Sequence, residues 1–204
     1  MLISAIKQNS PERLTVVFTS GEELKTTLSA VTELRLCVGK ELDDSGFKEL
    51  KTLSARTLGR ERALEYISRR RMSRRELIDK LREKGEDEET AEYCADWLES
   101  RGFIDDASYA GAVVRHYAAK GYGIGRIRQE LSRRGIAREL WEDAEKELPG
   151  GTDKLDRLIA QRLRDPSDRD EVRKLSAMLY RRGFSWEEIR AGLERFGSDT
   201  EDDT

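Results

Sequence analysis

Few residues in this chain have the type and spacing that catalysis or metal binding requires. His116 is the only histidine among 204 residues, and no cysteine or acidic cluster lies at metal-ligand spacing from it. We therefore expect His116 to lie on the surface or in ordinary packing. Asp105 and Asp106 precede an expected helix, where adjacent carboxylates usually cap the helix start. The sequence predicts no catalytic residue, no metal site and no cofactor.

A glycine-rich segment, Gly121-Tyr122-Gly123-Ile124-Gly125, superficially suggests a phosphate-binding loop. It follows no expected strand and lacks the Lys-Ser/Thr ending with which such loops hold phosphate and metal. We interpret it as a loop between helices. Cys37 and Cys94 form no CxxC pair, and we interpret them as ordinary thiols of an intracellular protein.

The composition favours thin helical layers over a single thick core, because hydrophobic residues make up 37% of the chain and charged residues 39%. The net charge is only −3, so electrostatic binding of a polyanion would need local segregation of charge. The N-terminus is too short in apolar residues for a signal peptide, and no run of about 18 apolar residues could span a membrane. We expect a cytoplasmic protein.

Residues 1–53 are expected to form a small β-meander with a helical tail. Runs that favour strands occur at residues 2–7, 14–19 and 24–28, with turn residues between them. The helical tail is expected from about Ala30. Because a sheet of three short strands is marginal alone, it should pack against the helices that follow.

From about residue 54 the chain repeats a helical pattern, in which an apolar residue is followed by Leu four residues later and by Gly another four residues later. The pattern occurs as Leu77-Leu81-Gly85, Ile127-Leu131-Gly135 and Leu175-Leu179-Gly183. Apolar residues four apart share one helix face, and a glycine just past the last turn favours the end of a helix. Each pattern therefore predicts a helix with a buried face.

Each pattern lies between two further expected helices. The earlier helix is expected at about residues 57–70, 106–119 and 153–164, and a helix start follows each glycine. Ser73 with Glu76, and Ser185 with Glu188, match the capping box. A period near 48 residues predicts a tandem array, so the expected fold is mainly α, with three three-helix repeats after the β-rich segment. The repeats are expected at residues 54–104, 105–149 and 150–197, with a Pro149-Gly150-Gly151 linker and a disordered acidic tail at 198–204.

The charge at one outward position changes sign between the repeats. The residues one before and six after the first apolar residue lie far from the buried face and nearly above one another. They are Glu76 and Glu83 in the first repeat, Arg126 and Arg133 in the second, and Lys174 and Arg181 in the third. We expect the four basic residues to form one outward surface that binds DNA phosphates or acidic side chains. A solvated helix surface without a partner is the alternative.

Further basic residues accompany this surface. Arg115 and Lys120 belong to residues 115–138, which contain seven basic residues and one acid. A second candidate cluster consists of Arg69, Arg70 and Arg75, whereas Arg74 lies close to the buried face and could form an internal ion pair. The three tryptophans fall at different distances from the glycines, so we expect Trp97, Trp141 and Trp186 to pack in cores or between repeats.

Segments of all three repeats match motifs of one known family. The first repeat contributes residues 66–77 with Lys80-Leu81 and Lys84-Gly85; the second contributes Phe103-Ile104-Asp105-Asp106, Tyr109-Ala110, Gly121, Gly123, Arg126-Ile127, Glu130-Leu131 and Gly135-Ile136; the third contributes Arg181-Arg182-Gly183-Phe184-Ser185. In this order and spacing they resemble the RecX family, the regulators of the RecA recombinase. Met72 is more apolar, and Glu86 less apolar, than that resemblance leads us to expect.

The resemblance covers about residues 1–196 and implies a function. It implies a monomer without enzymatic activity that lies in the groove of RecA–single-stranded-DNA filaments and restrains strand exchange and ATP turnover, in recombination, DNA repair and the SOS response. The partners would be the RecA filament and single-stranded DNA within or beside it. A helix-turn-helix-like protein that binds duplex DNA without RecA is the first alternative, although the near-neutral net charge weighs against it. A scaffold for unrelated proteins is the second.

Overall fold

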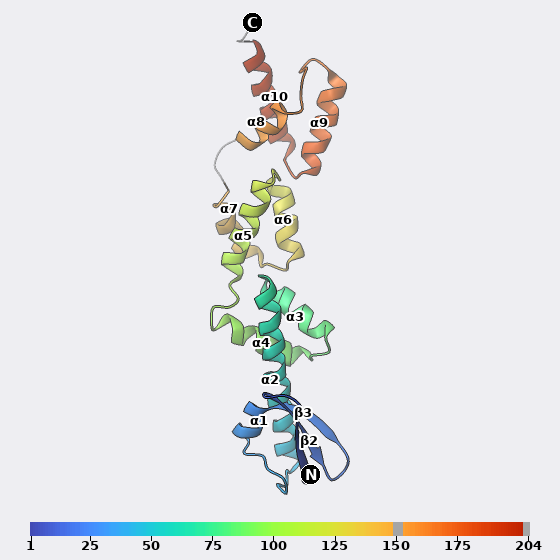
Figure 1. Cartoon of the computed structure of the whole chain (residues 1–204). Coiled ribbons are helices and arrows are strands. Elements are labelled where there is room, and N and C mark those ends of the chain that lie inside the picture. Colours follow the sequence, from blue (N-terminus) through green and yellow to red (C-terminus); the bar gives the residue numbers. More distant parts are fainter. Residues whose placement is uncertain (149–152, 202–204) are drawn as a thin grey trace. The chain divides into compact units, whose positions relative to one another are not determined.

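The β-favouring runs near the N-terminus form an antiparallel sheet, as predicted. In the computed structural model, β1 (Ile3–Gln8), β2 (Arg13–Phe18) and β3 (Glu23–Thr27) pair in the order β1-β2-β3. The short helix α1 (Leu28–Glu33) follows β3. The structure describes residues 1–148 and 153–201 (Figure 1). The chain divides into two compact units, Met1–Ile104 and Asp105–Thr204.

The sheet packs against the long helix α2 (Asp44–Arg69). Val16 and Phe18 are buried, and the Phe18 ring meets Phe47 of α2 edge-on, with ring centroids 5.3 Å apart. The Ser54 hydroxyl of α2 also donates a hydrogen bond of 2.8 Å to Thr26 of β3. The helix therefore supplies the apolar surface and the polar partners that a three-stranded sheet needs.

Helix α2 begins well before the expected residue 57, because its N-terminal half belongs to the β-rich segment. Asp43 caps it by accepting a hydrogen bond of 2.7 Å from the amide of Gly46. Gly59 lies within α2, where its lack of a side chain lets α4 approach closely. A Cβ built there would lie 2.9 Å from the Cys94 sulfur. One helix thus serves both the sheet and the first repeat.

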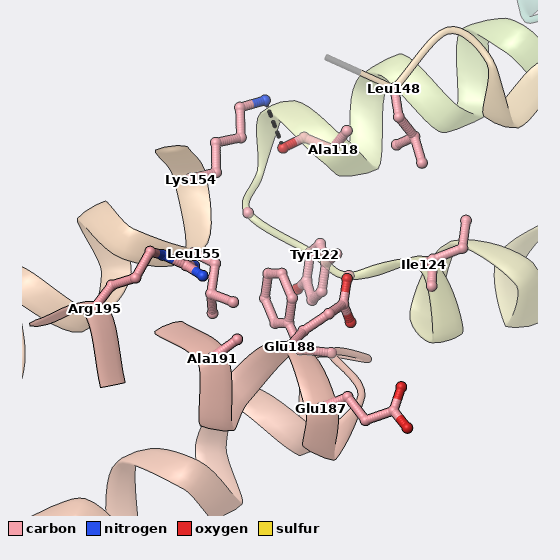
Figure 2. Close-up of a pocket in the computed structure, with 13 residues that line it drawn as sticks. Ala118, Tyr122, Ile124, Leu148, Lys154, Leu155, Glu187, Glu188, Ala191 and Arg195 are labelled. Carbon is pink, nitrogen blue, oxygen red and sulfur yellow. Dashed lines mark hydrogen bonds between the residues drawn. The ribbon is translucent and has the colours of Figure 1, made fainter. Parts of the chain in front are cut away.

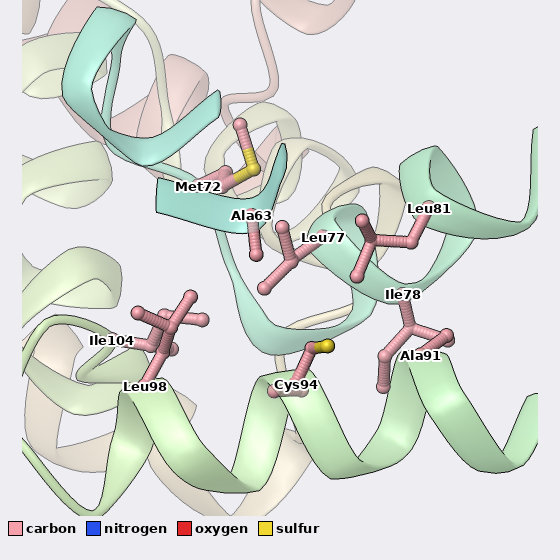
Figure 3. Packing of buried hydrophobic residues seen from close by; sticks show 10 residues of the cluster. Ala63, Met72, Leu77, Ile78, Leu81, Ala91, Cys94, Leu98 and Ile104 are labelled. Atoms are coloured by element: carbon pink, nitrogen blue, oxygen red, sulfur yellow. The ribbon is translucent and has the colours of Figure 1, made fainter. Parts of the chain in front are cut away.

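The first repeat is completed by α3 (Arg74–Glu83) and α4 (Glu88–Glu99). Leu77 and Leu81 are fully buried, as the repeated pattern predicts. Figure 3 shows their side chains between the helices, facing Cys94 and Leu98 of α4. Met72 is buried in the same core, which accounts for an apolar residue at this position.

The second and third repeats each enclose a core of their own. The second contains α5 (Asp106–Ala119), α6 (Ile124–Arg133), the 3-10 helix η1 (Arg138–Leu140) and α7 (Trp141–Glu145). The third contains α8 (Asp153–Ala160), α9 (Arg169–Arg181) and α10 (Trp186–Glu201). The predicted apolar faces are again buried, namely Ile127, Leu131, Leu175 and Leu179. The mainly helical fold with three three-helix repeats is confirmed.

Two boundaries in the third repeat differ from the expectation. Helix α8 ends at Ala160 instead of residue 164, and α10 continues to Glu201, past the point where a disordered tail was expected to begin. The proposed linker Pro149-Gly150-Gly151 begins at the edge of the described residues and lies outside them, as do residues 202–204.

The middle helix of every repeat ends in the same way. Gly85, Gly135 and Gly183 have φ angles of 93°, 65° and 90°. The residue after each glycine donates a backbone hydrogen bond to the second buried leucine, over 3.1 Å to Leu81, 3.1 Å to Leu131 and 3.3 Å to Leu179. This is the Schellman motif, which satisfies the last carbonyls of a helix and requires the left-handed conformation that glycine adopts most easily.

Candidate partner-binding surface

The outward basic positions of α6 and α9 are exposed to different degrees. Lys174 and Arg181 of α9 are exposed, and neither forms an ion pair within the part of the chain that the structure describes. On α6, the Arg133 side chain is 69% exposed and that of Arg126 is 43% exposed. The two α9 cations are therefore the freer ones to meet a partner.

Both outward arginines of α6 form ion pairs with the same carboxylate, that of Glu130. Its side chain is 5% exposed, and it pairs with Arg126 at 3.1 Å and with Arg133 at 2.9 Å. Arg134 also pairs with it, and the Arg134 guanidinium is held in place by Tyr109, which accepts a hydrogen bond of 3.3 Å. Three arginines around one glutamate leave this face of α6 with a net positive charge.

The neighbouring arginines also lower the pKa of the Glu130 carboxyl. Burial alone would raise the pKa of its carboxyl, but hydrogen bonds from Arg134, Arg133 and Tyr117 outweigh this and lower the pKa to about 2. Glu130 is therefore ionised at neutral pH and holds the arginine side chains in fixed positions. Glu130 is the single acid among residues 115–138, but its burial among the arginines is not apparent from the sequence.

Backbone contacts join the end of α9 to the start of α6. The amides of Gly123 and Gly125 donate hydrogen bonds of 2.9 Å to the carbonyls of Arg182 and Gly183. A Cβ built at Gly183 would lie 2.2 Å from the backbone nitrogen of Arg126, and one at Gly123 would lie 2.5 Å from the carbonyl of Gly183. These glycines let the two backbones touch, so the glycine-rich segment is a joint between the second and third repeats.

Because of this joint, the four outward basic residues follow one another along α9 and then along α6. Arg181 lies two residues before Gly183, and Gly183 touches the backbone of Arg126. Lys174 and Arg133 each lie seven residues farther away along their helices, which is about 10 Å at 1.5 Å per residue. The four residues therefore occupy successive stretches of α9 and α6, one after the other.

The remaining basic candidates are mostly engaged in ion pairs. Arg115 pairs with Glu147, and Lys120 lies over the ring of Tyr117 at 5.9 Å from its centroid. In the first repeat, three short ion pairs engage the candidate cluster: Arg69 with Glu65 at 2.5 Å, Arg70 with Glu76 at 3.2 Å, and Arg75 with Asp79 at 3.1 Å. Exposed pairs of this kind contribute little to stability and can exchange with a partner.

Arg74 forms the internal ion pairs that its position on the helix suggested. It pairs with Glu92 at 2.7 Å, with Asp96, and with Glu99 at 3.4 Å, all on α4. Its guanidinium thereby ties α3 to α4. Glu76, by contrast, is half-buried, because it completes the capping box with Ser73 as well as pairing with Arg70.

Asp105 caps a helix, and His116 lies on the surface. Asp105 caps α5 by accepting a hydrogen bond of 2.9 Å from the amide of Ser108. His116 is exposed and lies edge-on to Tyr117. Within the described ranges 1–148 and 153–201, no group of three or more histidine, cysteine, aspartate or glutamate side chains could hold a metal ion. Over the same ranges, no helix is long and apolar enough to cross a membrane.

A hollow of about 390 Å³ lies beside the joint between the second and third repeats. Figure 2 shows Tyr122 and Leu155 at its wall, and Lys154, whose ammonium donates a hydrogen bond of 2.8 Å to the carbonyl of Ala118. Arg195, at its rim, pairs with Asp156 at 2.6 Å. Glu188, which also lines the hollow, accepts a hydrogen bond of 2.7 Å from the amide of Ser185, so three of the charged side chains at this hollow are held by neighbouring groups.

The fold and this surface define a class of protein: a tandem array of three-helix repeats that carries exposed cations. Comparison with known families identifies it further. Models described as the first, second and third three-helix domains of RecX match residues 60–98, 105–144 and 153–193. The chain belongs to the RecX family, which confirms the resemblance of its motifs.

Relatives and solved structures agree with this assignment. A regulatory protein RecX of Xanthomonas citri is 39% identical over 134 residues, which are 64% of this chain and 83% of the relative. Another, of Halorhodospira halophila, is 34% identical over 70% of this chain and 90% of its own length. A crystal structure of regulatory protein RecX is 26% identical and superposes with a TM-score of 0.72 over 93% of this chain and 97% of its own. The crystal structure of RecX from Lactobacillus salivarius is 27% identical and superposes with a TM-score of 0.59. The match covers 69% of this chain and 96% of that one.

Proposed function

We propose that this chain binds RecA–single-stranded-DNA filaments and lowers their strand exchange and ATP turnover without catalysing a reaction itself. Membership of a family of regulatory proteins supports a regulatory role. The observation that carries the filament contact is the succession of basic residues along α9 and α6, joined end to end at Gly183. A filament offers repeating DNA phosphates and acidic side chains to such a series.

The α9 cations are expected to contribute more than those of α6. Lys174 and Arg181 have no carboxylate within ion-pair distance among the described residues, so their charge is fully available. Arg126 and Arg133 share Glu130, which offsets part of their charge but fixes their positions. Free cations give the stronger attraction, whereas fixed ones lose less side-chain entropy on binding.

The mechanism we propose is occupation of the filament groove by successive repeats. Each repeat makes modest contacts, and contacts in series within one chain act at high effective concentration, which gives avidity. A chain bound to neighbouring RecA protomers would hold them in one arrangement. Strand exchange and ATP turnover would fall because both need that arrangement to change.

Titration of the chain against three targets tests this function. The targets are RecA filaments on single-stranded DNA, naked single-stranded DNA and naked duplex DNA, at equal salt. We expect the tightest binding to the filament, together with a fall in the rates of strand exchange and ATP hydrolysis. Tightest binding to naked duplex, with unchanged RecA activity, would instead favour a helix-turn-helix-like protein that acts without RecA.

A further inference from the structure

A pair of stacked aromatic rings is exposed on the third repeat. Tyr180 of α9 and Trp186 at the start of α10 lie with ring centroids 5.0 Å apart and ring planes 18° from parallel. Their exposed fractions are 54% and 55%. The prediction that Trp186 packs in a core or between repeats is therefore wrong. Large rings that a fold leaves in water at such an exposure suggest a contact with another molecule.

A groove continues from this ring pair along α10. It encloses about 410 Å³ and is lined by Trp186, Ile189, Leu193, Arg190, Ser176 and Glu194. Arg190 lies one helical turn from Trp186, on the same face of the helix. The wall beside the tryptophan thus combines an aromatic ring, aliphatic side chains and a guanidinium group. A flat ring can stack there, and an anionic group attached to that ring can reach the cation.

The charges around the ring pair favour an anionic ligand. Arg190 lines the groove beside Trp186, is exposed, and has no carboxylate partner within the residues that the structure describes. The acids next to Trp186 lie elsewhere: Glu187 and Glu188 line the hollow shown in Figure 2, on another side of α10. Glu188 also accepts a hydrogen bond of 2.7 Å from the amide of Ser185, in the capping box.

Glu194 is the acid that does line the groove. It lies eight residues after Trp186, about 12 Å along the helix axis at 1.5 Å per residue. Arg190 is placed midway between the two. Glu194 therefore lies at the end of the groove away from the aromatic rings, and Arg190 is the charged residue of the groove nearer to Trp186.

We propose that Tyr180 and Trp186 form a stacking site for an unpaired base of a single-stranded nucleic acid, with Arg190 contacting a flanking phosphate. Each ring uses one face against the other, so the base stacks on a face that remains free. Aromatic platforms combined with cations are typical of single-strand binding, because every base has a π-face and every linkage has a charge. A duplex does not fit, since its bases are already stacked and paired. The site acts without the recombinase and goes beyond the function proposed above.

Binding of a labelled twenty-residue deoxythymidine oligonucleotide by fluorescence anisotropy, without RecA, tests this site. Because stacking of one base contributes roughly 1–3 kcal/mol, Trp186→Ala should weaken binding about fivefold or more. Trp186→Phe keeps an aromatic face and should retain most of the affinity. Phe103→Ala is the matched control, since Phe103 is an aromatic residue that is 58% exposed in the other unit, and it should bind as the unchanged chain does.

An oligonucleotide of the same length with abasic sites separates stacking from phosphate contact. The unchanged chain should bind it about as weakly as Trp186→Ala binds the deoxythymidine strand. Equal binding of the abasic and the complete strand, equal binding by Trp186→Ala and the unchanged chain, or no binding of the complete strand at low salt would overturn the proposal. Loss of RecA-filament binding in Trp186→Ala with unchanged oligonucleotide binding would show a protein contact instead. No RecA is present in the oligonucleotide assays, so their outcome is independent of the recombinase function.

Discussion

At Glu130, arginine side chains from one helix converge on a single carboxylate. The side chain is 5% exposed, and hydrogen bonds from Arg134, Arg133 and Tyr117 overcome the effect of burial and lower its pKa to about 2. The ionised form of this carboxyl is therefore more stable in the folded state than in the unfolded chain. Such a group stabilises the fold above the pKa of the unfolded state, and this contribution disappears as the pH falls toward the folded pKa.

We expect Glu130→Gln to lower the free energy of unfolding at pH 7 by about 2–3 kcal/mol, since it leaves the mostly buried Arg134 without its counter-charge. The difference from the unchanged chain should shrink between about pH 4.5 and pH 2, where the native carboxyl itself becomes protonated. Chemical denaturation at several pH values measures both effects. Glu139→Gln is the matched control, because Glu139 is exposed in the same repeat. Equal stability of the two variants at pH 7 would contradict this account of Glu130.

Among the helices, the three C-terminal glycines share one conformation but have different surroundings. Gly85 has open space around its α-carbon, whereas a Cβ at Gly183 would meet the backbone of Arg126 at 2.2 Å. Both have positive φ, so alanine costs about 1 kcal/mol at either position for the backbone conformation alone. At Gly183 the added atom must also push the third repeat away from the second.

We therefore expect Gly183→Ala to open the joint and Gly85→Ala to leave its repeat nearly unchanged. The amides of Gly123 and Gly125, whose hydrogen bonds cross the joint, should exchange with solvent at least tenfold faster in Gly183→Ala. Hydrogen exchange followed by NMR measures this directly, and Gly85→Ala should keep both rates. Unchanged protection of the two amides in Gly183→Ala would refute the joint.

The sequence predicted the helical repeats well because their determinants are local. The spacing of Leu131 and Gly135 specifies a buried face and a helix end within one turn, and Ser185 caps a helix through residues three positions away. The length of α2 could not be predicted in the same way, because the sheet that covers its N-terminal half is distant in sequence. The joint at Gly183 was also missed, since it depends on a backbone contact with Arg126, which lies in another repeat.

The basic residues of the candidate surface were predictable from the sequence, but their ion pairs were not. A helical wheel places Arg126 and Arg133 on the outer side of α6, but it cannot show that both bind Glu130, which also accepts a hydrogen bond from Tyr117 of α5. Exposure of Trp186 likewise depends on how α9 and α10 meet. Local periodicity therefore identified the cations, and only the packed structure distinguished the free ones from the paired ones.

For the whole molecule, the central claim is that this RecX-family chain regulates RecA filaments through exposed cations of its third repeat. Charge reversal at Arg126 or Arg133 is a poor test of this claim, because a new acid would face Glu130 and destabilise the second repeat. Lys174 and Arg181 are exposed and have no ion pairs among the described residues, so Lys174→Glu with Arg181→Glu should leave folding nearly unchanged.

The most direct measurement is the affinity of this double variant for RecA filaments on single-stranded DNA, at about 0.1 M salt. Its matched control is Lys25→Glu with Lys48→Glu, which reverses the same number of exposed charges in the N-terminal part of the chain. We predict that the Lys174 and Arg181 variant binds about tenfold more weakly or worse, that the control binds normally, and that added salt weakens the unchanged chain. A folded Lys174 and Arg181 variant that binds filaments and slows strand exchange as the unchanged chain does would contradict the account.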